Sequence, residues 1–121
     1  ANFSFGEFPD GLTLDSEGAF WVTSIFSNKL IRVMPNGEKK IIFEDSDPAY
    51  LNLIETVYKK GNLTKEMMSM VKGKVLKNIS SLAFGGENLK EIYLGCLLGE
   101  EIAYFKNDVA GLEPAFWKNF A

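Results

Sequence analysis

The chain has 121 residues, of which 46% are hydrophobic and 24% charged, and its formal net charge is −3. This balance indicates one globular domain with a modest core, and it excludes the basic surface expected of a nucleic-acid-binding protein. No apolar run is long enough to span a membrane. The sequence contains no histidine and one cysteine, Cys96, which excludes His-based metal sites and an internal disulfide. A reducing compartment is therefore favoured, and we expect a cytoplasmic protein.

The first part of the chain has the pattern of strands joined by short turns. Residues 2–5 alternate phenylalanine with small residues and predict a short edge strand. The sequence Pro9-Asp10-Gly11 is typical of a turn, and Asn36-Gly37 favours a tight hairpin. Around these turns we expect strands over residues 12–14, 19–24, 30–34 and 39–43. Four successive antiparallel strands predict one blade of a β-propeller, whose repeats span about 40–45 residues.

Residues 46–73 break this pattern and predict a helical insertion between two blades. Ser46 or Asp47 is suited to cap a helix, Pro48 to its first turn and Gly61 to its end. A second helix is expected from Thr64 to about residue 71. The apolar residues of the first helix recur at helical spacing and are Tyr50, Leu53, Ile54, Val57 and Tyr58. The methionines of the second helix are interpreted as packing residues, with a partner groove as the alternative.

From residue 79 the strand pattern returns, with strands expected over 79–84, 91–96, 101–105 and 114–117. These segments repeat the first unit, since Leu14 corresponds to Phe84 and Trp21 to Tyr93. The sequence therefore predicts an all-β fold over residues 1–121: a single partial β-propeller domain of about two four-stranded antiparallel blades with the helical insertion. Trp21 and Tyr93 are expected to pack between blades, whereas Asp15 and Glu17 are expected to be solvated hairpin residues.

Several of these segments together resemble the regucalcin/gluconolactonase family, which includes senescence marker proteins and luciferin-regenerating enzymes. The resemblance covers most of the chain except about residues 48–77. The stretches that carry it are 9–15, 17–18, 20–22, 28–33, 35–37, 79–86, 92–96 and 102–105. Members of the family are six-bladed propellers that hydrolyse lactones with a divalent metal, usually calcium. The resemblance implies that this chain corresponds to the C-terminal part of such a propeller.

The resemblance also implies a role for Asp10, because the Asp of the family's Pro-Asp-Gly lies at the channel mouth, binds the metal and takes part in catalysis. Ser80 occupies the corresponding place in the second repeat, so Asn78 and Ser80 are candidates for lining the channel, with ordinary turn and strand roles as the alternatives. The family's other metal ligands lie in segments that this chain does not match. A calcium or zinc site is therefore expected to be incomplete here, since calcium takes about 6–8 oxygen ligands.

Two functions follow from these expectations. The first is the C-terminal portion of a metal-dependent lactone hydrolase acting on a small lactone, incomplete as a catalyst by itself. The alternative is a non-catalytic oligomerisation or binding module derived from a propeller. Because about three repeats are normally required to bury the faces of such blades, we expect either a homo-oligomer, trimer or dimer, or additional blades from another polypeptide.

Overall fold

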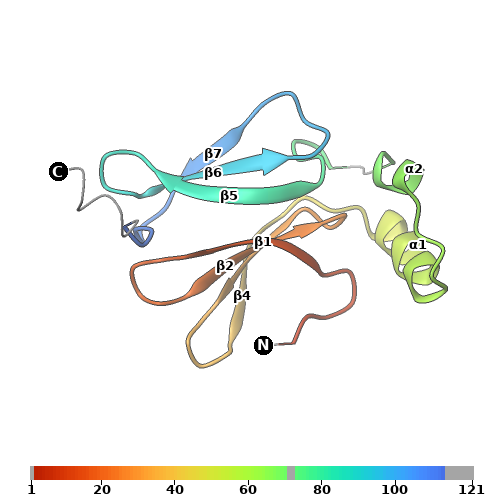
Figure 1. The fold of residues 1–121 in the computed structure, drawn as a ribbon, viewed down its shortest axis with the longest axis horizontal. Helices are drawn as coiled ribbons and strands as arrows, with labels where there is room; N and C mark the ends of the chain where they lie inside the picture. Colours follow the sequence, from red (N-terminus) through yellow and green to blue (C-terminus); the bar gives the residue numbers. More distant parts are fainter. Residues whose placement is uncertain (1, 71–72, 114–121) are drawn as a thin grey trace.

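The computed structural model describes residues 2–70 and 73–113, and it contains two antiparallel sheets (Figure 1). The first sheet has four strands in the order β1-β2-β3-β4, and the second has three in the order β5-β6-β7. Two helices, α1 and α2, lie between β4 and β5 in the chain. The strands are β1 (Phe8–Leu14), β2 (Phe20–Ile25), β3 (Lys29–Val33), β4 (Lys39–Glu44), β5 (Ile79–Gly85), β6 (Glu91–Cys96) and β7 (Ala103–Lys106). The structure is thus mostly β, as the sequence predicts.

Two expectations for the N-terminal part are wrong. Residues 2–5 form no strand, and the Glu7 amide instead donates to the Ser4 carbonyl at 3.1 Å in a turn. The sequence Pro9-Asp10-Gly11 is not a connecting turn, because it lies inside β1. The pairing of β1 with β2 shifts register between Pro9 and Leu12, so these residues form a β-bulge. The bulge leaves β1 continuous, but it bends the strand and changes the direction in which the side chains at the bulge point.

The helical segment follows the predicted signals at its start. Helix α1 (Pro48–Lys59) begins after Asp47, whose carboxylate accepts a hydrogen bond from the Tyr50 amide at 3.0 Å. Gly61 follows the helix with a φ of 71°, a conformation that ends helices readily. Helix α2 (Lys65–Met68) is shorter than predicted, and residues 71–72 lie outside the described part of the chain.

The two helices are tied to each other through one side chain. The Tyr50 hydroxyl donates to the Met67 carbonyl at 2.8 Å, and both residues belong to one apolar cluster with Phe26. Burial raises the pKa of the Tyr50 hydroxyl to about 12, so this group stays protonated and remains a donor at neutral pH. Among the residues that the structure describes, no helix is long and apolar enough to cross a membrane.

The internal repeat predicted from the sequence is present in the register of the strands. Each repeat has the same bulge at the same point of its first strand, and the bulges contain Asp10 and Ser80. The fourth strand predicted over residues 114–117 lies outside the described residues, so a four-stranded second blade stays a prediction. The equivalent pairs are Pro9–Ser24 and Ile79–Cys96 before the bulge, and Leu12–Val22 and Leu82–Leu94 after it.

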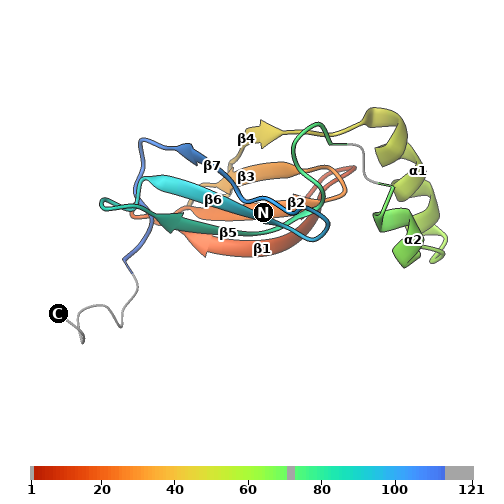
Figure 2. The ribbon, with the colours of Figure 1, turned by 90° about the horizontal axis from the view of Figure 1, so that it is seen from above.

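The two sheets stack face to face, and the main core lies between them (Figures 1 and 2). The ring of Trp21 on β2 is buried and meets the ring of Phe84 on β5 edge-on, with centroids 5.5 Å apart and an interplanar angle of 88°. This geometry suits the opposite charge of an aromatic edge and face. The buried members of this core are Trp21, Leu30, Leu76, Ile79, Ile92 and Leu94.

A buried carboxylate holds the Trp21 ring in this position. Asp15 is buried rather than solvated, which corrects the sequence-based expectation for this residue. Its oxygens accept hydrogen bonds from Trp21 Nε1 and from Arg32 Nε, each at 2.8 Å, and from the amides of Glu17 and Ala19. Burial acts to raise the pKa of Asp15, but the four donors outweigh it, so the pKa lies below its usual value. Glu17 is exposed as expected, yet it also pairs with Arg32 at 2.7 Å.

We predict that Trp21→Ala lowers the free energy of unfolding by about 3–5 kcal/mol, because it leaves a cavity between the sheets and removes a partner of Asp15. Tyr104→Ala is the matched control, since Tyr104 lies on the outer face of the second sheet and is exposed. The control is expected to cost less than about 1 kcal/mol. Urea unfolding at low protein concentration measures both values, and equal costs would contradict the assigned core.

We predict that Asp15→Asn lowers the free energy of unfolding by about 2–3 kcal/mol at pH 7, because Arg32 loses a charged acceptor. The pKa of Asp15 is lowered in the folded state, so its contribution is complete above the unfolded pKa of about 3.9 and disappears as the pH falls through the folded value. The difference between wild type and variant should therefore shrink below about pH 4. Asp10→Asn is the exposed control. A difference that stayed constant into acid would rule out this role of Asp15.

Candidate functional site

The two candidate residues Asp10 and Ser80 lie at one junction between the sheets. Gly11, which follows Asp10, packs so closely against β5 that a Cβ atom at this position would overlap the Ser80 carbonyl oxygen. The Gly11 amide is fixed from the other side by a 2.8 Å hydrogen bond to Thr23 Oγ1. Because only glycine permits this approach, the bulge of β1 is held against the bulge of β5. The two segments that the sequence predicts to be equivalent in the two repeats therefore also lie next to each other in the structure.

Asp10 itself is presented to solvent at this junction. Its residue is exposed, whereas Ser80 is half-buried. Within residues 2–70 and 73–113 no group of three or more His, Cys, Asp or Glu side chains is placed to hold a metal. A single carboxylate beside a serine does not match the 6–8 oxygens that calcium takes. The donor set of the described residues therefore does not fit a calcium ion at Asp10.

Asn78 has a different environment from Asp10 and Ser80. It is buried, and its backbone adopts the left-handed conformation with a φ of 61°. Its Oδ1 accepts from the Phe26 amide and its Nδ2 donates to the Met68 carbonyl, each at 2.8 Å. Both ends of the side-chain amide are thus used inside the chain, where they connect the end of the first β-hairpin with the helical segment. These partners lie 52 and 10 positions away in the chain, and a channel-lining role for Asn78 stays a prediction.

Asp45 anchors the segment that leads into β5, and sequence reasoning missed this role. Its carboxylate accepts from the amides of Lys74, Val75 and Leu76 at 2.8–2.9 Å. Burial acts to raise its pKa, but these three amides together lower it below the ordinary value. The acidic sequence 45–47 predicts the start of a helix, and in the structure Asp47 is the residue of these three that caps α1. Nothing in the local sequence indicates amide donors so far along the chain.

Asn28 completes this anchor from the first sheet. Its Nδ2 donates to the carbonyls of Leu76 at 2.9 Å and Asp45 at 3.1 Å, and its Oδ1 accepts from the Ile79 amide at 3.2 Å. The residue has a φ of 48°, a left-handed conformation that asparagine tolerates better than most residues. Asp45 and Asn28 thereby fix where β5 begins and so set the place of Ser80 at the junction.

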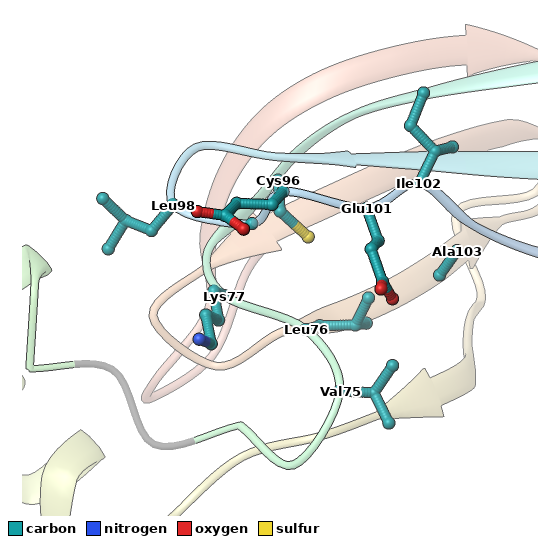
Figure 3. Close-up of a pocket in the computed structure, with 10 residues that line it drawn as sticks. Val75, Leu76, Lys77, Cys96, Leu98, Glu101, Ile102 and Ala103 are labelled. Carbon is teal, nitrogen blue, oxygen red and sulfur yellow. The ribbon is translucent and has the colours of Figure 1, made fainter.

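A separate surface cavity of about 470 Å³ lies beside this anchor, between the segment preceding β5 and the loop from β6 to β7. Figure 3 shows the side chains of Cys96 and Glu101 directed toward the same space, with Leu76 on its floor and Lys77 at its side. Cys96 is half-buried and forms no disulfide. The cavity does not include Asp10, Asn78 or Ser80, so the predicted site residues lie apart from it.

Comparisons with known proteins give similarity to solved structures but not to sequence families. No protein-family model and no curated protein matches the chain. A solved structure of a luciferin-regenerating enzyme is similar to it, with a TM-score of 0.49 and 18% sequence identity. The similarity covers 86% of this chain and 30% of that enzyme, so the chain spans less than a third of its length. Luciferin-regenerating enzymes are also among the members of the family that the sequence resembles.

Proposed function

We propose that this chain forms two adjacent sheets from the C-terminal portion of a lactone-hydrolase-like propeller, and that it is not a complete catalyst by itself. The observation that carries this proposal is the junction of the two equivalent bulges. Asp10 and Ser80 hold the same position in the two repeats, and Gly11 brings their strands into contact. The junction presents one solvent-accessible carboxylate to any further groups placed opposite it.

The metal requirement of such a hydrolase is not met by the described residues alone. Asp10 offers at most two carboxylate oxygens, and among residues 2–70 and 73–113 no group of three or more His, Cys, Asp or Glu side chains is placed to hold a metal. Calcium or zinc binding in a complete site would require ligands from other segments, as the sequence resemblance implies. The part assigned to this chain is therefore to shape the junction and orient Asp10, not to bind a metal by itself.

A second candidate function is a non-catalytic association module. It is supported by large apolar side chains that are exposed on the sheets and on the helical segment. Leu53 and Tyr58 on α1 and Met70 after α2 are exposed, as are Leu12 on β1 and Tyr104 on β7. Apolar surface of this extent is typical of surfaces that bind another protein.

We predict that 10 mM CaCl₂ raises the Tm of the chain by less than about 2 °C, because one carboxylate with a Kd near 10 mM stabilises by only about 0.4 kcal/mol. The same chain should not hydrolyse gluconolactone with calcium or zinc. Thermal unfolding and a hydrolysis assay measure these results, with Asp10→Asn and the hairpin variant Glu38→Gln run in parallel.

A complete calcium site with a Kd of about 0.1 mM would instead stabilise the chain by about 2.7 kcal/mol at this concentration. A rise of several degrees in wild type and in Glu38→Gln that is absent in Asp10→Asn would therefore contradict the proposal. It would mean that this chain binds calcium through Asp10 without ligands from elsewhere.

A further inference from the structure

The outer face of the first sheet is apolar and partly open. Strand residues alternate between faces, and those that point away from the second sheet are Leu12, Leu14, Phe20, Val22, Ile31, Val33 and Ile41. Leu12 is 62% exposed, Phe20 41% and Ile41 48%. Val22, Ile31 and Val33 form a separate cluster beneath them. This arrangement is typical of a core face that lacks a covering layer.

The N-terminal segment reaches both ends of β3 on this face, because its Glu7 contacts Lys29 at one end of that strand and Lys39, which is paired with the other end. Glu7 accepts from Lys39 at 2.6 Å and pairs with Lys29 at 3.8 Å, and Lys39 lies over the ring of Phe3 at 5.2 Å. Figure 1 shows this segment on the side of the first sheet that faces away from the second. The remaining area is left open around Leu12, and it is the part available to another protein surface.

The outer face of the second sheet is also open, but its chemistry differs. Tyr93 and Tyr104 are cross-strand neighbours whose rings stack with centroids 5.5 Å apart. Tyr104 is 62% exposed, and the residues beside the pair on β5 include Ser81 and Ala83, which are exposed. Two aromatic rings on a surface of small residues therefore face solvent. Together they form a shallow aromatic platform.

The internal repeat shows what each open face is shaped to contact. By strand register, the stacked pair Tyr93–Tyr104 is equivalent to the pair Trp21–Arg32, whose residues are buried on the inner face of the first sheet. The face that covers Trp21 comes from the second sheet. Its residues Phe84, Ile92, Leu94 and Leu82 are equivalent by register to Leu14, Phe20, Val22 and Leu12 on the open face of the first sheet.

We propose that the outer face of the first sheet docks on the outer face of the second sheet of another copy of this chain. This contact repeats the internal junction, so Tyr93 and Tyr104 meet the surface around Leu14 and Phe20 as Trp21 meets Phe84. Both surfaces of the internal junction are thus present twice in each chain, once used and once at least partly open. The inference names a partner for the association module proposed above and rests on that second function, while it is independent of metal binding.

The two docking faces are different surfaces, so the interface is heterologous. Each copy offers one first-sheet face and one second-sheet face, and successive copies join head to tail until the ring closes. A heterologous interface can be told from a two-fold symmetric dimer by mixing two variants that are each blocked on a different face. Blocking either face on every copy removes all contacts, whereas two copies that are blocked on different faces retain one complementary pair.

The experiment measures mass by light scattering for wild type, Leu12→Glu, Tyr104→Glu and an equimolar mixture of the two variants. Protein is used up to about 0.5 mM, where an interface with a Kd near 0.1 mM is mostly formed. Wild type is expected above its monomer mass of 13.5 kDa, and each variant alone at 13.5 kDa. The mixture is expected at twice the monomer mass, because one intact junction remains. Both substituted residues are exposed, and circular dichroism checks that the variants fold.

Leu53→Glu is the matched control, because Leu53 is also an exposed leucine but lies on α1. It is expected to associate like wild type. If Leu53→Glu alone dissociates the oligomer while both sheet variants stay associated, the proposed faces are wrong and the association function remains. A variant that stays dimeric without its partner would also overturn the head-to-tail contact. A monomeric wild type would contradict the contact and the association module together.

Discussion

The edge-on contact of Trp21 with Phe84 determines how the rest of the structure is arranged. The position of the indole is fixed, because the buried Asp15 carboxylate accepts a hydrogen bond from its Nε1 and another from Arg32 on the neighbouring strand. A buried charge is tolerated only when its partners are in place, so this network specifies one orientation of the ring. The ring in turn fixes the distance and direction of the second sheet. The strand junction at Gly11 and Ser80 follows from that placement.

The same packing explains why the two halves of the chain are equivalent in register but different in surroundings. In the first repeat the aromatic position on the second strand is buried, and in the second repeat its counterpart Tyr93 faces outward. One internal interface uses one copy of each complementary face and leaves the other copies open. At the junction Asp10 is exposed, and among the described residues no group of three or more His, Cys, Asp or Glu side chains is placed to hold a metal. The two functions proposed above therefore depend on the same structural question, which is what groups lie opposite the open surfaces.

The sequence predicts correctly the elements that depend on local periodicity. Its predictions are wrong or incomplete where contacts between residues far apart in the chain determine the local structure. Strands β2 to β6 and the capped start of α1 follow from alternation and from Asp47, which act within a few residues. The composition of the Pro-Asp-Gly segment predicts a turn, but in the structure it is a bulge within a strand that packs closely against β5. Asp15 was expected in solvent because its hairpin is polar, and only the fold brings Arg32 to it. For the site, the sequence repeat predicts that Asp10 and Ser80 occupy equivalent positions. The anchor formed by Asp45 could not be predicted in this way, because its amide donors belong to a segment that follows both helices in the chain.

A double-mutant cycle between Trp21 and Phe84 tests the central claim most directly, since it measures the contact between the sheets rather than either side chain alone. The free energy of unfolding is measured for wild type, Trp21→Ala, Phe84→Ala and the double variant. The structure predicts that the double variant loses less than the sum of the single losses, with a coupling of about 1 kcal/mol or more. Additive losses, with a coupling near zero, would contradict the stacking of the two sheets through these rings.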